Sequence, residues 1–212
     1  TPPAGGGSVT SNPRSRPFQV PGLSDVIAIA AGLLSSAAVK SDGTVWAWGM
    51  ATGTSVLSLS PTQVAGLSNI ARVSLGTYYL LALDRSGKVW SVGAGGLGQL
   101  GTGSSVSAAP MQVPALTGIV DIAAGAASSY ALGADGTAYA WGDNSHGQIG
   151  DGTYASQRTP VLVVNPTFNG PLDLRPEVPN QIPASLIPSL LLSTNRSSDL
   201  INLSLSADIR GL

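Results

Sequence analysis

Val45-Trp46-Ala47-Trp48-Gly49 is a stretch that the chain repeats twice in altered form. It returns as Val89-Trp90-Ser91-Val92-Gly93 and as Ala138-Tyr139-Ala140-Trp141-Gly142, at offsets of 44 and then 49 residues. Mostly large side chains alternate with small ones in each copy, and this period of two is typical of a β-strand. Large side chains opposite small ones allow neighbouring sheets to interdigitate.

Other landmarks keep the same offsets, and repeats of this length indicate a repeat architecture. A single glycine, a turn pair and a Pro-containing segment mark each copy: Gly32, Gly76 and Gly125; Asp42-Gly43, Ser86-Gly87 and Asp135-Gly136; Pro17-Phe18-Gln19-Val20, Pro61-Thr62-Gln63-Val64, Pro110-Met111-Gln112-Val113 and Pro160-Val161-Leu162-Val163. These landmarks divide the chain into units at 17–60, 61–109 and 110–159, with the next unit starting at 160.

Each unit contains four short segments with strand character. In the first unit they lie at about 17–20, 26–31, 35–40 and 44–49, separated by Gly, Pro and Asp-Gly turns. Glycine in these turns accepts the positive φ that tight hairpins require. Four strands per unit of about 45 residues, with no sustained helical period, predict an all-β fold made of β-propeller blades. The repeated aromatic residues are then core between blades rather than a stacking platform for sugars.

The third unit carries the motifs most fully, as Ile122-Ala123-Ala124-Gly125, Trp141-Gly142-Asp143-Asn144 and 147–152, Gly-Gln-Ile-Gly-Asp-Gly. With these motifs the chain resembles the regulator of chromosome condensation repeat family from about Arg14 to Val164. The resemblance implies a seven-bladed propeller whose members mostly present loops to protein partners. The first unit departs from the pattern, because only 12 positions separate Gly49 from Pro61, against 17 and 18 in the other units, and Gly-Gln-Leu-Gly is missing.

The number of units falls short of such a ring. Three four-stranded blades plus the start of a fourth are expected, and residues 1–16 read as a linker or the end of a preceding repeat. Either further blades lie outside this sequence, or copies of the chain join. An open stack of blades exposes unpaired strand edges and apolar faces, which recruit another chain. Self-association is therefore expected, unless further blades of the same longer chain complete the ring.

Residues 165–212 depart from the repeat. Prolines crowd this segment, which ends with alternating residues that place Ile201, Leu203 and Leu205 on one face of a strand. Two interpretations stay open. The segment is a Pro-rich linker leading into another strand-rich domain, or it is an arm whose terminal strand pairs with a sheet edge of this chain or a neighbouring one.

Composition excludes several classes of protein. Ten Lys and Arg against eleven Asp and Glu give a net charge of -1, which argues against nucleic acid as a partner. No stretch is apolar for about 18 consecutive residues, so no membrane span is expected. The absence of cysteine excludes disulfides and thiolate chemistry. Low charge and the Ser, Thr and Gly content favour an exported protein, extracellular or on the cell surface.

No constellation of residues predicts catalysis, a metal or a cofactor. The single histidine, His146, has no nucleophile partner in a known arrangement, and Tyr154 stands where a twelve-residue calcium loop requires its closing Glu. The Gly-x-Gly-x-x-Gly spacing at 93–98 opens no helix. The less regular loop of the third unit is the predicted partner-binding site. Its predicted contact residues are Asp143, Asn144, His146, Tyr154 and Arg158.

These observations favour a non-enzymatic exported repeat protein that serves as an interaction or self-assembly scaffold. An alternative is the ligand-binding or partner-binding propeller of a larger secreted enzyme. A third alternative, guanine-nucleotide exchange on a small GTPase, ranks lowest, because this sequence has neither a complete ring nor a basic character.

Overall fold

The computed structural model describes residues 17, 19–50, 58–165 and 170–172. Its main elements are three four-stranded antiparallel sheets, here called the first, second and third blades. The first blade contains β1 (Val26–Ala31), β2 (Ser35–Lys40), β3 (Val45–Gly49) and β4 (Ser58–Gln63). The second contains β5 (Ile70–Leu75), β6 (Tyr79–Asp84), β7 (Val89–Ala94) and β8 (Val106–Gln112). The third contains β9 (Ile119–Ala124), β10 (Ser128–Gly133), β11 (Ala138–Gly142) and β12 (Gln157–Leu162), and the short strands β13 (Val164–Asn165) and β14 (Gly170–Pro171) pair beyond it.

Every blade is a meander in which each strand pairs with the next one along the chain. The second and third strands are joined by the repeated turn. In the first blade Gly43 has φ of 81° and its amide donates to the carbonyl of Lys40, while the Asp42 carboxylate accepts from the amide and hydroxyl of Thr44. The Asp-Gly turns predicted from the sequence are thus formed.

The outer strand of each blade differs from the sequence-based expectation. Residues 17, 19 and 20 are not in a strand, and Pro61 lies in β4, which pairs with β3. Likewise Pro160 lies in β12 and completes the third blade instead of starting a fourth. The physical reason is that a recurring segment shows the period of the repeat but does not show which sheet that segment is hydrogen-bonded to. The Pro-containing segment therefore closes the preceding sheet.

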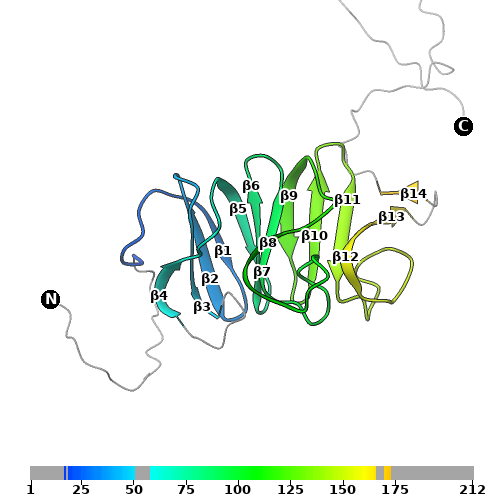
Figure 1. Cartoon of the computed structure of the whole chain (residues 1–212), viewed down its shortest axis with the longest axis horizontal. Helices are drawn as coiled ribbons and strands as arrows, with labels where there is room; N and C mark the ends of the chain where they lie inside the picture. Colours follow the sequence, from blue (N-terminus) through cyan, green and yellow to red (C-terminus); the bar gives the residue numbers. More distant parts are fainter. Residues whose placement is uncertain (1–16, 18, 51–57, 166–169, 173–212) are drawn as a thin grey trace, which may run out of the picture. The chain divides into compact units, whose positions relative to one another are not determined.

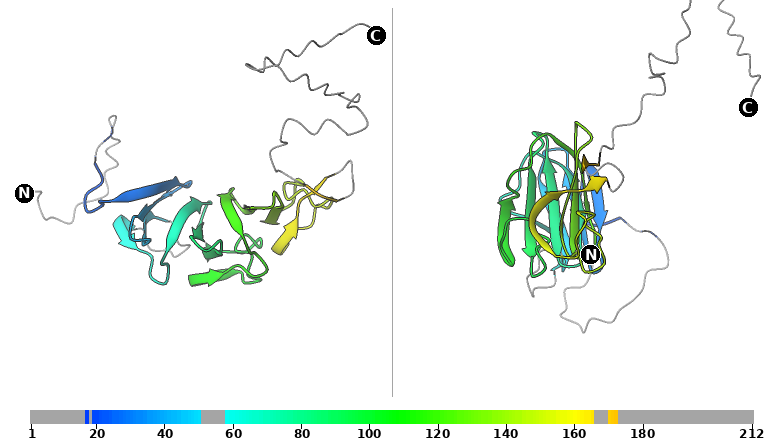
Figure 2. Two further views of the ribbon diagram at one scale, coloured as in Figure 1. Left: turned by 90° about the horizontal axis from the view of Figure 1, so that it is seen from above. Right: turned by 90° about the vertical axis from the view of Figure 1, so that its right-hand side faces the viewer.

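The three blades lie side by side in sequence order, as the views from the front and from above show (Figures 1 and 2). Strand β1 contacts β5, and β5 contacts β9. One apolar cluster fills the boundary between the first and second blades. It contains Val39, Val45, Leu67, Leu80 and Val92, among others. A second cluster fills the boundary between the second and third blades, and it includes Leu81, Val89, Leu100, Leu116 and Trp141.

The structure buries only part of the large residues that the sequence predicted as inter-blade core, since Trp46, Trp90 and Tyr139 are half-buried. Val92 and Trp141 occupy the same repeat position and are both buried at the boundary with the preceding blade. Trp48 occupies this position in the first blade, where it is only half-buried. The repeated aromatic position is therefore an inter-blade contact in the second and third blades and an open one in the first.

Two expectations lie outside the described residues. These are the linker at 1–16 and the terminal strand with Ile201, Leu203 and Leu205. The described part of the chain contains no helix that is long and apolar enough to cross a membrane.

Candidate protein-binding surfaces

The first blade ends the row of blades with an apolar face that no other described blade covers. We call it the entry face, and it consists of Val20, Leu23, Ser36 and Trp48. These four side chains are half-buried and line a cavity of about 480 Å³ together with Ile29, which is 80% exposed. Exposed apolar area of this kind marks an interaction site more often than a catalytic one.

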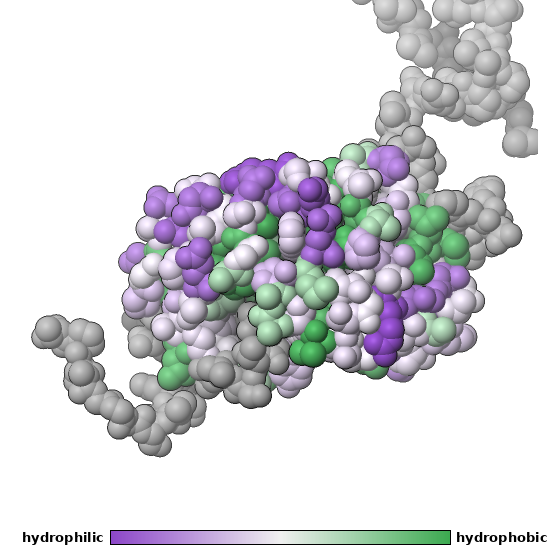
Figure 3. Space-filling model, viewed as in Figure 1, coloured by the Kyte–Doolittle hydropathy of each residue, from purple (hydrophilic) through white to green (hydrophobic). Residues whose placement is uncertain are grey.

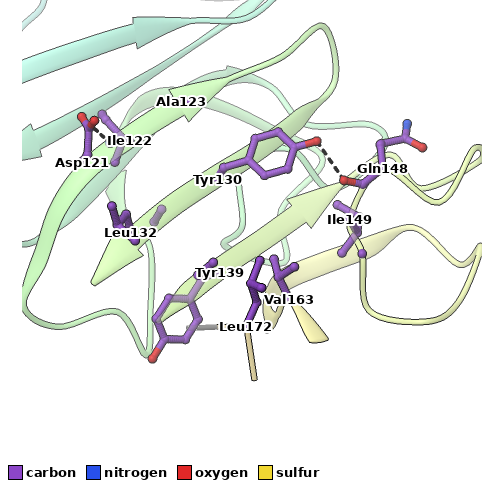
Figure 4. A pocket seen from close by; sticks show the side chains of 13 residues that line it. Asp121, Ile122, Ala123, Tyr130, Leu132, Tyr139, Gln148, Ile149, Val163 and Leu172 are labelled. Atoms are coloured by element: carbon purple, nitrogen blue, oxygen red, sulfur yellow. Dashed lines mark hydrogen bonds between the residues drawn. The ribbon is translucent and has the colours of Figure 1, made fainter. Parts of the chain in front are cut away.

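The third blade ends the row on the other side with a second apolar face. We call it the exit face, and it consists of the half-buried residues Tyr130, Leu132, Gln148 and Gly150, with Ile149 fully buried beneath them. It lines a cavity of about 320 Å³, into which Tyr139, Val163 and Leu172 also project (Figure 4). Hydrophobic side chains gather on the surface near this end of the row (Figure 3).

The polar groups of the exit face are few and ordered. The Tyr130 hydroxyl donates to the carbonyl oxygen of Gln148 at 3.0 Å (Figure 4). The Gln148 side chain in turn donates to Asp143 and accepts from the amide of His146. These contacts hold the segment around Gln148 against the blade, so the exit face is already shaped without a partner.

The predicted partner-binding loop runs from Asp143 to Arg158, and one buried residue organises it. Asn144 is fully buried; its side-chain amide donates to the carbonyls of Thr153 and Ala155, and its side-chain oxygen accepts from the amide of Ile149. From the sequence, Asn144 was predicted as a partner contact, but its side chain is buried and forms its hydrogen bonds inside the loop. Its role is to shape the loop, because buried polar groups are costly unless they are bonded.

Two carboxylates fasten the same loop. Burial raises the pKa of Asp151, but hydrogen bonds from Thr153, Gln157 and Asn144 outweigh burial and hold that pKa below its usual value. The backbone amide of Ser145 is the main reason that the pKa of Asp143 is also lowered, and the Ser145 and Gln148 side chains add to it. Both groups are therefore charged structural acceptors at neutral pH.

The remaining predicted contacts face solvent. His146 and Arg158 are exposed, and Tyr154 is 76% exposed beside Gly147 and Gly152, with which it lines a shallow cavity. The three side chains are available to a partner, and their binding role stays a prediction. Within the described residues, no group of three or more His, Cys, Asp or Glu side chains is placed to hold a metal ion.

The boundary between the second and third blades contains a polar group that sequence reasoning missed. The hydroxyl of Tyr79 donates to the carbonyl of Ser128 at 2.8 Å and accepts from the Ser129 hydroxyl at 2.9 Å. Burial raises the pKa of this phenol, and the bond from Ser129 offsets only part of that effect. Tyr79 is thus a neutral structural bridge between blades.

Family models show where this chain belongs. Two models, both described as the regulator of chromosome condensation (RCC1) repeat, match residues 26–52 and 119–148, and residues 86–132 and 135–173. Together they cover more than half of the chain. The chain belongs to the RCC1 repeat family. No curated protein matches it in a direct comparison.

Solved structures share the fold. Human WBSCR16 is 26% identical over 66% of this chain, with a TM-score of 0.59. Prp20p from Saccharomyces cerevisiae, described with its binding properties to Gsp1p and histones, is 22% identical over 69% of the chain, with a TM-score of 0.61. Yeast RCC1 (Prp20) bound to Kap60 is 22% identical over 70%, with a TM-score of 0.58. The RCC1 repeat chain described here spans only about 40% of the length of these proteins.

The two open faces were not visible from single motifs. Trp48 looked equivalent to Trp141, and nothing in its own stretch shows that one indole is covered and the other is not. The missed signal lies in Val20, Leu23 and Ser36, whose repeat equivalents are Val113, Leu116 and Ser129. All three equivalents are buried, so comparing the units position by position identifies the entry face.

Proposed function

We propose that this RCC1 repeat chain is a non-enzymatic scaffold that binds protein partners through its open blade faces and the loop of its third blade. The observation that carries this proposal is the pair of apolar faces at the two ends of the row, each lining a cavity. Large partly buried apolar side chains of this kind supply the central contacts of protein interfaces.

The family supports a protein as the partner. RCC1 repeat propellers are binding or regulatory modules, and the solved relative Prp20p is described with Gsp1p, histones and Kap60. From these relatives the proposal takes only the class of partner. The net charge of -1 favours a protein over nucleic acid, because the sequence has only ten Lys and Arg residues, offset by eleven Asp and Glu, to contact phosphates.

The loop of the third blade supplies a second binding element in this proposal. Tyr154 and Arg158 are exposed on a loop that Asn144 and Asp151 hold in one shape. Aromatic and arginine side chains on a fixed backbone lose little entropy on binding, which makes them frequent anchors of interfaces.

The test is capture of partners on the immobilised full chain, followed by measurement of the affinity for each identified protein in purified form. We expect specific binding in the micromolar range or tighter. Trp48→Ala and the pair Tyr154→Ser with Arg158→Ser test the two elements separately, and Met111→Ala, on the outer strand of the middle blade, is the control. Binding that is equally strong in all variants, or no purified binder at all, contradicts the proposal.

We also propose that the chain acts outside the cell or at its surface. Its low content of charged residues, 10%, and its richness in glycine support this location. Fractionation of the producing cells, with an antibody against the chain, tests it. Signal confined to the cytosolic fraction contradicts it.

A further inference from the structure

The boundary between the second and third blades shows what covers a buried tryptophan in this chain. The carbonyl oxygen of Gln99 accepts two hydrogen bonds across this boundary, from the indole nitrogen of Trp141 at 2.9 Å and from the hydroxyl of Ser129 at 2.8 Å. Gly101 lies under the indole, and a Cβ atom at that position would be 2.6 Å from Nε1 of Trp141. The side-chain oxygen of Gln99 stays in its own loop, where it accepts from the amide of Leu97. The contact therefore needs a backbone carbonyl two residues before a glycine, and it does not need the glutamine side chain.

The entry face repeats the half of this boundary that the third blade supplies. Each of its four residues lies 93 positions before a buried residue of that half: Val20 before Val113, Leu23 before Leu116, Ser36 before Ser129, and Trp48 before Trp141. Ser36 and Trp48 are also cross-strand neighbours, as Ser129 and Trp141 are. The first blade thus presents the donor half of the contact on a face that no other described blade covers.

The boundary between the first and second blades shows that the two halves vary together. There the first blade lacks the Gly-Gln-Leu-Gly element, and the second blade carries Leu80 and Val92 in place of Ser and Trp. Neither Leu80 nor Val92 has a side-chain donor. A Ser and Trp pair at the entry face therefore indicates a carbonyl and a glycine as its counterpart.

The repeat position of residues 17–20 shows which segment belongs opposite Trp48. In each described blade the residue equivalent to Val20 directly follows the outer strand, and its amide donates to the first residue of the third strand: Val64 to Val45, Val113 to Val89, and Val163 to Ala138. The loop that contacts Trp141 leads into such an outer strand, because Gln99 and Gly101 precede β8 in the chain. By the same connection, the loop that belongs opposite Trp48 leads into residues 17–20 and lies within residues 1–16.

A second copy of the chain does not fit at this position. Its third blade already has an outer strand, and Val163 holds the place that Val20 would need. The hydroxyl of Tyr130 already donates to the carbonyl of Gln148, and a Cβ atom at Gly150 would be 3.1 Å from Cγ1 of Val163. The carbonyl and the glycine of the exit face are therefore in use within their own blade.

Residues 4–7 supply a carbonyl and a glycine at the matching place in the sequence. Their sequence, Ala-Gly-Gly-Gly, begins 13 positions before Pro17, and Gly-Gln-Ile-Gly at 147–150 begins 13 positions before Pro160. Gly5 then corresponds to Gln99, and Gly7 corresponds to Gly101. Because the acceptor is a backbone carbonyl, a glycine in place of the glutamine keeps it, and Gly7 has no Cβ atom to keep an indole away.

From these matches we propose that residues 4–7 dock on the entry face of their own chain. The carbonyl oxygen of Gly5 then accepts from the indole nitrogen of Trp48 and from the hydroxyl of Ser36, and Gly7 lies under the indole. The cavity of about 480 Å³ at this face gives the segment room. The inference goes beyond the proposed binding function, because it names what covers the entry face when no partner is bound. A protein partner at this face then displaces residues 4–7.

Exchange of the indole N–H protons with solvent, measured by NMR on the full chain, tests this docking. The chain has four tryptophans, so Trp48→Phe identifies the Trp48 signal, and the buried Trp141 indole is the reference for a bonded group. Gly7→Ala places a methyl group against the indole and should make the Trp48 proton exchange about tenfold faster, the effect of losing one hydrogen bond. Equal exchange of this proton in Gly7→Ala and in the unaltered chain overturns the inference.

Gly6→Leu is the matched control, which separates docking from a general effect of replacing glycine in this segment. The equivalent residues Leu100 and Ile149 are fully buried, so a leucine at position 6 should fit against the first blade. It should slow exchange of the Trp48 proton by about tenfold, the effect of burying part of one leucine side chain. Exchange that is unchanged or faster in Gly6→Leu contradicts the docking.

Exchange at several chain concentrations distinguishes docking within one chain from docking between copies. Residues 4–7 and the entry face belong to the same chain, so the exchange rate of the Trp48 proton should not depend on concentration. A rate that falls as the concentration rises would assign the contact to a second copy and overturn the inference. Failure of this docking leaves capture of partner proteins intact, so the two proposals are judged separately.

Discussion

The indole nitrogen of Trp141 donates a hydrogen bond to the carbonyl oxygen of Gln99, 2.9 Å away, across the boundary between the second and third blades. The indole is fully buried, and its ring approaches the backbone of Gly101 because glycine has no Cβ atom. A buried indole N–H without an acceptor costs free energy, so this bond fixes the position of one blade against the next.

Replacing Gly101 with alanine should therefore loosen this boundary. The added Cβ would lie 2.6 Å from Nε1 of Trp141, at a backbone φ of 71° that alanine adopts only with strain. We expect the free energy of unfolding to fall by about 2–4 kcal/mol, the sum of overpacking and backbone strain. Urea unfolding followed by tryptophan fluorescence measures it.

Gly103→Ala is the matched control. Gly103 has φ of 80° but no atom within 4 Å of an added Cβ, so only the backbone strain of about 1 kcal/mol applies. Equal destabilisation by the two substitutions would show that the indole contact adds nothing.

Sequence periodicity was enough to predict the fold, because the alternation in β3, β7 and β11 is a local property of each strand. It did not assign the outer strands, since the hydrogen-bonding partner of a segment such as Pro61–Gln63 depends on which sheet has a free edge. The burial of Asn144 was also missed. A loop Asn reads as exposed from its neighbours in sequence, and only the folded loop brings Thr153 and Ala155 to its amide.

Ala115 lies in a strained backbone conformation that glycine relieves. Its φ is 61°, and the equivalent residues of the other units, Gly22 and Gly66, have φ of 78° and 86°. Ala115→Gly should raise the free energy of unfolding by about 0.5–1 kcal/mol, because the left-handed strain removed exceeds the extra entropy of glycine in the unfolded chain.

The reverse substitution, Gly66→Ala, should lower the free energy of unfolding by a similar amount. An added Cβ there meets only Pro110 at 3.5 Å, an ordinary contact, so backbone strain is the main term. Thermal unfolding of both variants checks the pair. A loss of stability in Ala115→Gly would mean that the methyl group of Ala115 packs more favourably than its backbone is strained.

The loop of the third blade should lose protection in acid. Hydrogen bonds hold the pKa of Asp151 below its usual value, so its contribution to stability is complete above about pH 5 and is lost as the pH falls below about 4 through the lowered pKa. Exchange of the Thr153 amide, which donates to Asp151 at 2.9 Å, should then quicken relative to strand amides after correction for the intrinsic rate.

Asp151→Asn should show the fast exchange of Thr153 already at neutral pH, since the amide accepts these bonds less strongly than the carboxylate. The Leu81 amide in the middle of the second blade serves as the reference. Protection of Thr153 that does not change between pH 6 and pH 3 would exclude the carboxylate as the fastening group.

Tyr79 should make the stability of the chain sensitive to alkali. Burial raises the pKa of its phenol, so ionisation is easier in the unfolded chain, and stability is complete below about pH 10 and falls as the pH rises through the raised folded-state pKa. Tyr79→Phe should cost about 1–2 kcal/mol at neutral pH, because the Ser128 carbonyl and the Ser129 hydroxyl lose a buried partner. The same variant should unfold with a shallower dependence on pH between 9 and 11, whereas Tyr154→Phe, at an exposed position, should keep the original slope. Urea unfolding at stepped pH measures the free energy of unfolding of each variant. If that free energy falls with pH as steeply in Tyr79→Phe as in the unaltered chain, the alkali-sensitive group lies elsewhere.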